Sequence, residues 1–159
     1  MKGGLIMEKT LAVAKYLNEL NLKKYGCNMS EMKMHKMMYF SQRESLIVND
    51  NPLFDSEFEA WRYGPVLTDV RAQYSLGLLF KKESEELSAD DKKLVSDVYE
   101  RYSRFSAWDL STLSHSELSW KQAREGLRPE ENCNKKMSLS AMRVDAKREV
   151  LKRKGVVLA

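Results

Sequence analysis

Serine residues recur just ahead of segments in which hydrophobic residues follow helical spacing, and this arrangement limits the chain to a mainly α fold. A serine hydroxyl at such a position can accept a hydrogen bond from the first turn of a helix. Ser88 and Ser106 are also followed, three residues later, by Asp91 and Asp109, which is close to a capping box. The other cap candidates are Ser30, Ser114 or Ser116, and Ser138 or Ser140. We expect a compact single-domain fold of about six helices.

The hydrophobic spacing places the first helix from about Glu8 to near Gly26 and the second from Ser30 toward Ile47. Residues 1–7 precede this periodicity, so we expect a disordered leader followed by one domain over residues 8–159. Four methionines at positions 32, 34, 37 and 38 favour a packed core face, with an adaptable partner groove as the alternative. The last helix is expected over about residues 138–154.

Residues 57–63 alternate apolar and polar side chains, which predicts a short strand or extended segment. Gly64 and Pro65 follow it and indicate a turn. Because proline lacks the N–H that is unpaired in a first helical turn, Pro65 is predicted to begin a short helix that runs to about Tyr74.

The chain shows no pattern typical of an enzyme or a metalloprotein. Cys27, Cys133, His35 and His115 lack the spacing of zinc ligands, and the glycines form no phosphate-binding loop. His115 lies between two serines and near Glu117, but the members of a catalytic triad converge from separate parts of a chain. A surface or capping role for His115 is favoured. We therefore expect no catalytic residue, no metal and no cofactor.

Positive charge is concentrated near the C-terminal end of a chain whose net charge is +4. Grouped lysines and arginines are typical of nucleic-acid binding, but acids interrupt this group and no aromatic residue is interleaved for base stacking. A solvated face or a protein contact is therefore favoured over nucleic acid. The candidate partner-binding cluster is Arg143, Lys147, Arg148, Lys152 and Arg153.

The sequence also bears on the cellular compartment. No apolar run approaches the length that crosses a bilayer, and the first residues lack the pattern of a secretory signal. The two distant cysteines fit a reducing environment. We expect a cytoplasmic protein without a membrane partner.

Three separated sequence blocks together resemble one protein family. They read KMHKMMYFSQ over residues 33–42, PLF over 52–54 with FEAWRYGPV over 58–66, and LSTLSHSELSWKQAR over 110–124. They are similar to the patterns KLQKLLYYAQ, AWxxGPV and Lxxx(S/T)HxExxWxxAR of the Panacea domain, which occurs in SocA-like and GepA-like phage-associated antitoxins. The resemblance covers roughly residues 8–150. Methionines replace leucines, and His35 stands where glutamine is usual.

The resemblance implies a mostly helical, non-enzymatic antitoxin that neutralises a cognate toxin by direct binding. It also implies one alternative, an adaptor that delivers the toxin to a Clp-type protease. The basic segment, independently of the resemblance, leaves a nucleic-acid-binding regulator as a second alternative. We expect the signature residues mainly to build the fold, with neighbouring surface selecting the toxin. The signature residues, structural or toxin-binding, are Lys36, Tyr39, Gln42, Phe58, Trp61, Tyr63, Gly64, Pro65, His115, Glu117, Trp120 and Arg124.

Overall fold

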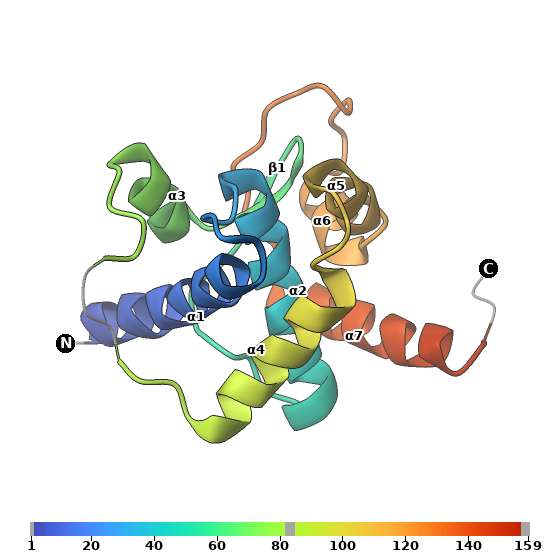
Figure 1. The fold of residues 1–159 in the computed structure, drawn as a ribbon. Helices are drawn as coiled ribbons and strands as arrows, with labels where there is room; N and C mark the ends of the chain where they lie inside the picture. Colours follow the sequence, from blue (N-terminus) through green and yellow to red (C-terminus); the bar gives the residue numbers. More distant parts are fainter. Residues whose placement is uncertain (1, 82–84, 157–159) are drawn as a thin grey trace.

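The second helix, α2, forms the centre of the molecule. The computed structural model describes residues 2–81 and 85–156, and α2 spans Glu31–Asn49. Every residue from Met34 to Arg43 is buried, because other elements cover all sides of this helix (Figure 1). The surrounding helices are α1 (Lys2–Tyr25), α3 (Thr68–Ser75), α4 (Ala89–Tyr102), α5 (Ala107–His115), α6 (Leu118–Ala123) and α7 (Leu139–Arg153).

The predicted mainly α class is confirmed. The described residues form seven helices and one two-stranded sheet, one helix more than the approximate number expected. Met34, Met37 and Met38 are fully buried, which agrees with a core face rather than an exposed groove. The start of α1 and the end of α7 lie on opposite sides of the molecule (Figure 1).

Four of the predicted serine caps are present. Ser30, Ser88, Ser106 and Ser138 each accept a hydrogen bond from the backbone N–H three residues later. At α5 the capping box is complete, since Asp109 also accepts from the backbone N–H of the cap residue.

The prediction that Ser114 or Ser116 caps α6 is wrong. The N-cap residue of α6 is Glu117, which makes no side-chain cap bond. The cap comes instead from α7, where the Asp145 carboxylate accepts from Leu118 N at 2.6 Å and from Ser119 N at 3.1 Å. Local sequence patterns do not predict this cap, because Asp145 is 27 residues away from Leu118 in the sequence.

The extended segment is one arm of a β-hairpin. β1 (Glu59–Trp61) pairs antiparallel with β2 (Gly64–Val66), and residues 135–137 lie along the other edge of β1. Pro65 is in β2 and α3 begins at Thr68, so the prediction that Pro65 opens a helix is wrong. Proline can stand in β2 because that strand has no further neighbour to receive an N–H.

The first helix begins at Lys2, ahead of the predicted start near Glu8. Side chains are described from Glu8 onward, and the leader assigned to residues 1–7 stays a prediction. Among the described residues, no helix combines the length and apolar character needed to span a membrane.

Candidate functional site

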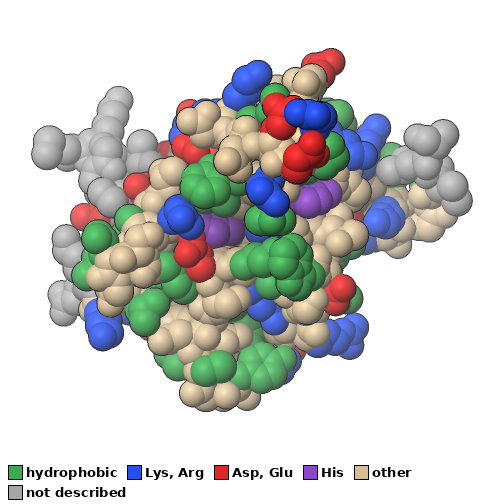
Figure 2. Space-filling model, turned by 90° about the horizontal axis from the view of Figure 1, so that it is seen from above, with side chains coloured by type: hydrophobic (Ala, Val, Ile, Leu, Met, Phe, Trp, Pro, Cys, Tyr) green, Lys and Arg blue, Asp and Glu red, His purple; other side chains and the backbone are tan. Residues whose placement is uncertain are grey.

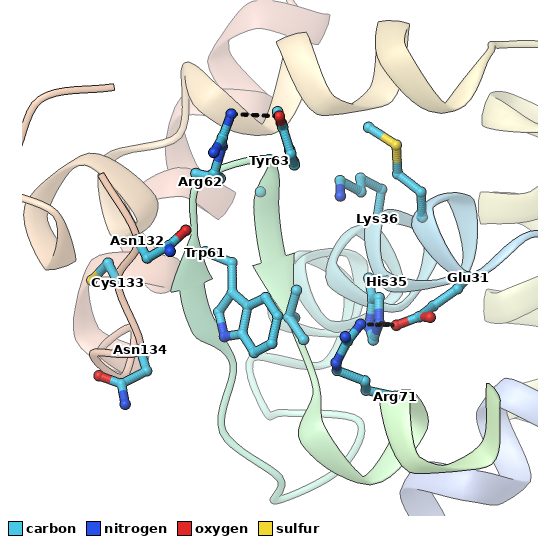
Figure 3. A pocket seen from close by; sticks show the side chains of 13 residues that line it. Glu31, His35, Lys36, Trp61, Arg62, Tyr63, Arg71, Asn132, Cys133 and Asn134 are labelled. Atoms are coloured by element: carbon cyan, nitrogen blue, oxygen red, sulfur yellow. Dashed lines mark hydrogen bonds and ion pairs between the residues drawn. The ribbon is translucent and has the colours of Figure 1, made fainter. Parts of the chain in front are cut away.

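A cavity of about 800 Å³ opens between α2, the β-hairpin, α3 and the segment that precedes α7, and we call it the hairpin pocket. Its volume lies in the range typical of ligand-binding clefts. Figure 3 shows the Trp61 ring and the side chains of Glu31, His35 and Arg71 around the same space. The residues that line it are Glu31, Met32, His35, Lys36, Trp61, Arg62, Tyr63, Gly64, Val66, Arg71, Asn132, Cys133 and Asn134.

Lys36 lies at the α2 side of the pocket and is only 2% exposed. Figure 3 shows its ammonium end directed toward the hairpin. Among the described residues, no hydrogen bond or ion pair reaches this ammonium group. Burial lowers the pKa of Lys36 to about 8, because a desolvated cation is disfavoured, and the charge of Glu31 opposes this shift only in part. At neutral pH the pocket therefore contains a mostly charged lysine without a partner.

The single carboxylate that lines the pocket is already occupied. Glu31 Oε2 accepts from Arg71 at 2.8 Å and lies 3.1 Å from His35 Nε2. The backbone N–H of Leu67 donates to His35 Nδ1 at 3.3 Å, which places the ring proton on Nε2, facing Glu31. Burial lowers the pKa of His35, which keeps the ring neutral at pH 7.

Gly64 lets the hairpin approach Lys36. Its φ is +124°, and a Cβ atom there would lie 2.7 Å from Lys36 Cε and 2.8 Å from Ser114 Oγ. Ser114 is fully buried and donates to the carbonyl of Ser111, so it has little freedom to move away. Both the backbone conformation and the close contact require glycine.

We expect Gly64→Ala to lower the free energy of unfolding by about 3 kcal/mol, through backbone strain and overpacking together. The matched control is Gly77→Ala, where φ is +69° but nothing lies within 4 Å of the added Cβ. Backbone strain alone should cost about 1 kcal/mol there. Urea denaturation of both variants measures the difference, and equal losses would show that the approach to Lys36 is not tightly packed.

Tyr63, an exposed aromatic residue of the pocket lining, packs against a second exposed aromatic residue, Trp108. Tyr63 is 45% exposed and Trp108 of α5 is 62% exposed, and their rings meet edge to face at 5.4 Å. Arg62 donates to Tyr63 Oη at 2.6 Å and lies over the same ring. Figure 2 shows the face that carries both histidines, with hydrophobic, basic and acidic side chains around them. Large exposed aromatics beside a cavity are typical of contact surfaces.

Residues of the third sequence block (110–124) support the β-hairpin. Trp120 is 8% exposed and donates from Nε1 to the carbonyl of Trp61 at 2.8 Å. The His115 ring stacks on Trp120 with centroids 4.1 Å apart, and the Arg124 guanidinium lies 5.0 Å from the same ring. These contacts fix the position of β1 and therefore of the pocket wall.

Arg124 also holds the segment that forms the far wall of the pocket. Its buried guanidinium donates to the carbonyls of Ala60 at 3.0 Å and Glu131 at 2.6 Å. Two longer bonds, both 3.3 Å, reach the carbonyls of Arg128 and Pro129. One side chain thus links β1 to the loop that continues into Asn132 and Cys133.

A buried polar network joins α2 to α6 and α7. Tyr39 Oη lies 3.0 Å from a carboxylate oxygen of Glu117 and 3.0 Å from one of Asp145, so its proton is shared between the two. Arg43 donates to Glu117 at 2.5 Å and to Tyr102 Oη at 2.8 Å. Burial raises the pKa of Glu117 to about 7, and the nearby Arg43 charge opposes this shift.

Three other signature residues lie in the interior. The Gln42 amide accepts from the backbone N–H of Leu53 and donates to the carbonyl of Phe54, so it orders the turn after α2. Phe58 is 1% exposed and packs on Tyr39. Pro65 is buried in β2. Of the signature residues, Lys36, Trp61, Tyr63 and Gly64 come together at the pocket.

The basic cluster on α7 is partly occupied by contacts within the chain. Arg143 pairs with Asp50 at 2.6 Å, and Arg153 pairs with Glu44 at 2.7 Å and Glu149 at 2.9 Å. The remaining members are exposed and form no ion pair within the described part of the chain: Lys147, Arg148 and Lys152. None of the five lines the hairpin pocket.

Sequence reasoning did not find several residues that shape the site: Glu31, Arg43, Arg71, Trp108 and Asp145. A signal existed for Arg43. Lys36, Tyr39 and Arg43 lie three and four residues apart, so they share one face of the helix. Polar side chains in that pattern indicate a buried network. Glu31, Arg71 and Trp108 have no such local signal.

The serine and histidine beside the pocket make structural contacts. Ser111 lies 3.4 Å from His115, but its hydroxyl donates to the carbonyl of Tyr63 at 2.6 Å, which is a structural contact. In the described ranges, no group of three or more His, Cys, Asp or Glu residues is placed to hold a metal ion. What the site offers is a buried cation, aromatic walls and a basic rim.

Comparison with known proteins identifies the class of chain that has this fold and this site. The profile of a family described as "Antitoxin SocA-like, Panacea domain" matches residues 34–121, which is more than half of the chain. This protein therefore belongs to the SocA-like Panacea antitoxin family. A search of curated proteins found no significant match, and neither did a search of solved structures. The matched range contains all of the signature residues except Arg124, which lies three residues beyond its end.

Proposed function

We propose that this protein is the antitoxin of a toxin-antitoxin pair and neutralises its toxin by direct binding through the face around the hairpin pocket. Membership of the antitoxin family supports a toxin partner. The observation that carries the choice of face is a pair of exposed aromatic rings: Tyr63, which lines a large open cavity, and Trp108, which contacts Tyr63. Aromatic residues are enriched among those that dominate binding energy at protein interfaces.

The different positions of the signature residues support the same choice of binding face. His115, Trp120 and Arg124 are turned to the back of β1 and hold it through hydrogen bonds and ring contacts. The hairpin turn at Arg62 and Tyr63 is thereby presented to solvent on a fixed support. A rigid contact surface loses little conformational entropy when a partner binds.

The first test is co-expression with the product of the neighbouring gene. If that product inhibits growth, this protein should restore growth and co-purify with it at a fixed stoichiometry. Restoration in a host without Clp-type proteases would support neutralisation by binding alone, whereas loss of protection in that host would support the adaptor alternative. A toxic neighbour that is neither bound nor relieved would contradict the proposal.

The second test addresses the face. We expect Tyr63→Ala and Trp108→Ala each to weaken toxin binding by about 2 kcal/mol, because each removes a large contact ring. The matched control is Leu151→Ala, which removes an exposed apolar side chain (39% exposed) from α7, away from the pocket. Calorimetric titration measures the three affinities. A loss confined to Leu151→Ala would place the interface on α7 instead.

A thiol probe gives a third, independent readout of the same face. Cys133 lines the pocket and Cys27 is exposed elsewhere, so a Cys27→Ser background leaves one thiol to follow. Bound toxin should slow alkylation of Cys133. An unchanged alkylation rate in the complex would contradict an interface at the pocket.

A further inference from the structure

The hairpin pocket contains a cation, Lys36, that has no counterion among the described residues. Lys36 is 2% exposed, and its ammonium group, which faces the cavity, donates no hydrogen bond to any described residue and forms no ion pair with one. A buried charge is costly unless it is paired. The nearest carboxylate, Glu31, already accepts from Arg71 and faces His35. The hairpin pocket is therefore suited to a ligand that supplies a negative charge next to Lys36.

The rim adds further positive charge. Arg62 stacks on Tyr63 and forms no ion pair within the described ranges, and Arg71 lies over the Trp61 ring at 5.0 Å. With Lys36, three permanent or mostly charged cations line the cavity against one carboxylate. The charged and titratable side chains around Lys36 are Glu31, His35, Arg62, Arg71 and His115.

The apolar lining of the hairpin pocket indicates which other chemical groups its ligand has. Trp61, Val66 and Met32 present apolar surface beside the lysine. A cavity of about 800 Å³ is much larger than a free carboxylate or phosphate ion. An acidic side chain on a polypeptide, flanked by apolar residues, would fill this space and match both the charge and the walls.

We propose that an acidic residue of the toxin inserts into the hairpin pocket and pairs its carboxylate with Lys36, while its apolar neighbours pack on Trp61. This inference rests on the proposed function and names the chemistry of the partner at the same face. Gly64 serves the pairing, because it allows the hairpin to close against the lysine stem without displacing it.

The test uses blocked peptides, so that it does not depend on the toxin. The probes are Ac-Leu-Glu-Leu-NH2 and its amide-matched partner Ac-Leu-Gln-Leu-NH2, titrated into the full chain and followed by NMR at the Trp61 indole N–H and the Lys36 Cε signal. The glutamate peptide should bind about tenfold or more tightly than the glutamine peptide, since charge-assisted hydrogen bonds are the stronger kind. It should also raise the pKa of Lys36 from its lowered value of about 8, because a carboxylate favours the charged amine.

Lys36→Met keeps an unbranched side chain and removes the charge. It should abolish the preference for the glutamate peptide and, because the uncompensated buried charge is gone, raise the Tm of the free protein by a few degrees. The raised Tm shows that the variant is folded. The control is Lys121→Met, an exposed lysine on α6, which should change neither quantity.

Three results would overturn the inference. Equal binding of the two peptides, or binding of neither, would contradict the proposal that the pocket binds a carboxylate. Inorganic phosphate that binds at Lys36 as tightly as the glutamate peptide would assign the pocket to a phosphate ligand. Toxin affinity unchanged by Lys36→Met would leave the antitoxin function intact and exclude the pairing, whereas a failure of all toxin binding would contradict the proposed function instead.

Discussion

Asp145→Ala is expected to lower the free energy of unfolding by about 3–4 kcal/mol, the largest effect of any single substitution considered for this fold. The carboxylate accepts from Leu118 N and Ser119 N, and it lies 3.0 Å from Tyr39 Oη. Removal leaves the start of α6 uncapped and a buried hydroxyl with one partner fewer. Urea denaturation followed by circular dichroism measures the loss.

The control for this substitution is Asp90→Ala in the first turn of α4, where the carboxylate is exposed and a serine hydroxyl already supplies the cap. It should cost about 0.5 kcal/mol or less, which is the usual worth of an exposed carboxylate near a helix N-terminus. If Asp145→Ala cost no more than this control, the capping of α6 by α7 would contribute little to stability.

Arg124→Met is expected to cost about 3 kcal/mol and to loosen one wall of the pocket. The buried guanidinium donates to carbonyls of β1 and of the loop beyond α6, and methionine leaves those acceptors unpaired. Hydrogen exchange of residues 126–134 should therefore accelerate more than that of α2, because local opening needs less energy there. Toxin affinity should fall as well, since Asn132 and Cys133 lie in the released segment.

Arg104→Met is the matched control, because this arginine is exposed and its only described contact is a long approach to the Phe105 ring at 6.0 Å. Neither stability nor exchange should change beyond about 0.5 kcal/mol. If hydrogen exchange accelerated equally in all parts of the Arg124→Met variant, residues 126–134 would not open independently of the rest of the fold.

How much of the fold the sequence predicts depends on the range of the interaction. The caps at Ser30, Ser106 and Ser138 were predicted because donor and acceptor are three residues apart. The cap of α6 was missed because its acceptor, Asp145, is on another helix. Pro65 was assigned to a helix start because the pairing of β1 with β2 is not encoded in its immediate neighbours.

The same limit applies to the site. The family resemblance named Lys36, Trp61, Tyr63 and Gly64 but did not place them around one cavity, since they come from two blocks. Trp108 carried no signal, because an exposed tryptophan in a short helix is recognisable only once Tyr63 is beside it. That no described residue supplies a counterion to Lys36 can be seen only in the folded molecule.

The way in which Trp120 and Arg124 hold β1 affects how the binding specificity of such a protein can evolve. Trp120 and Arg124 bind backbone carbonyls of Trp61 and Ala60 rather than side chains, so their contacts do not depend on which residues occupy the turn. Substitutions at Arg62 and Tyr63 should therefore alter what the surface recognises at little cost to folding. A library randomised at the turn would sample new specificities while nearly every member still folds.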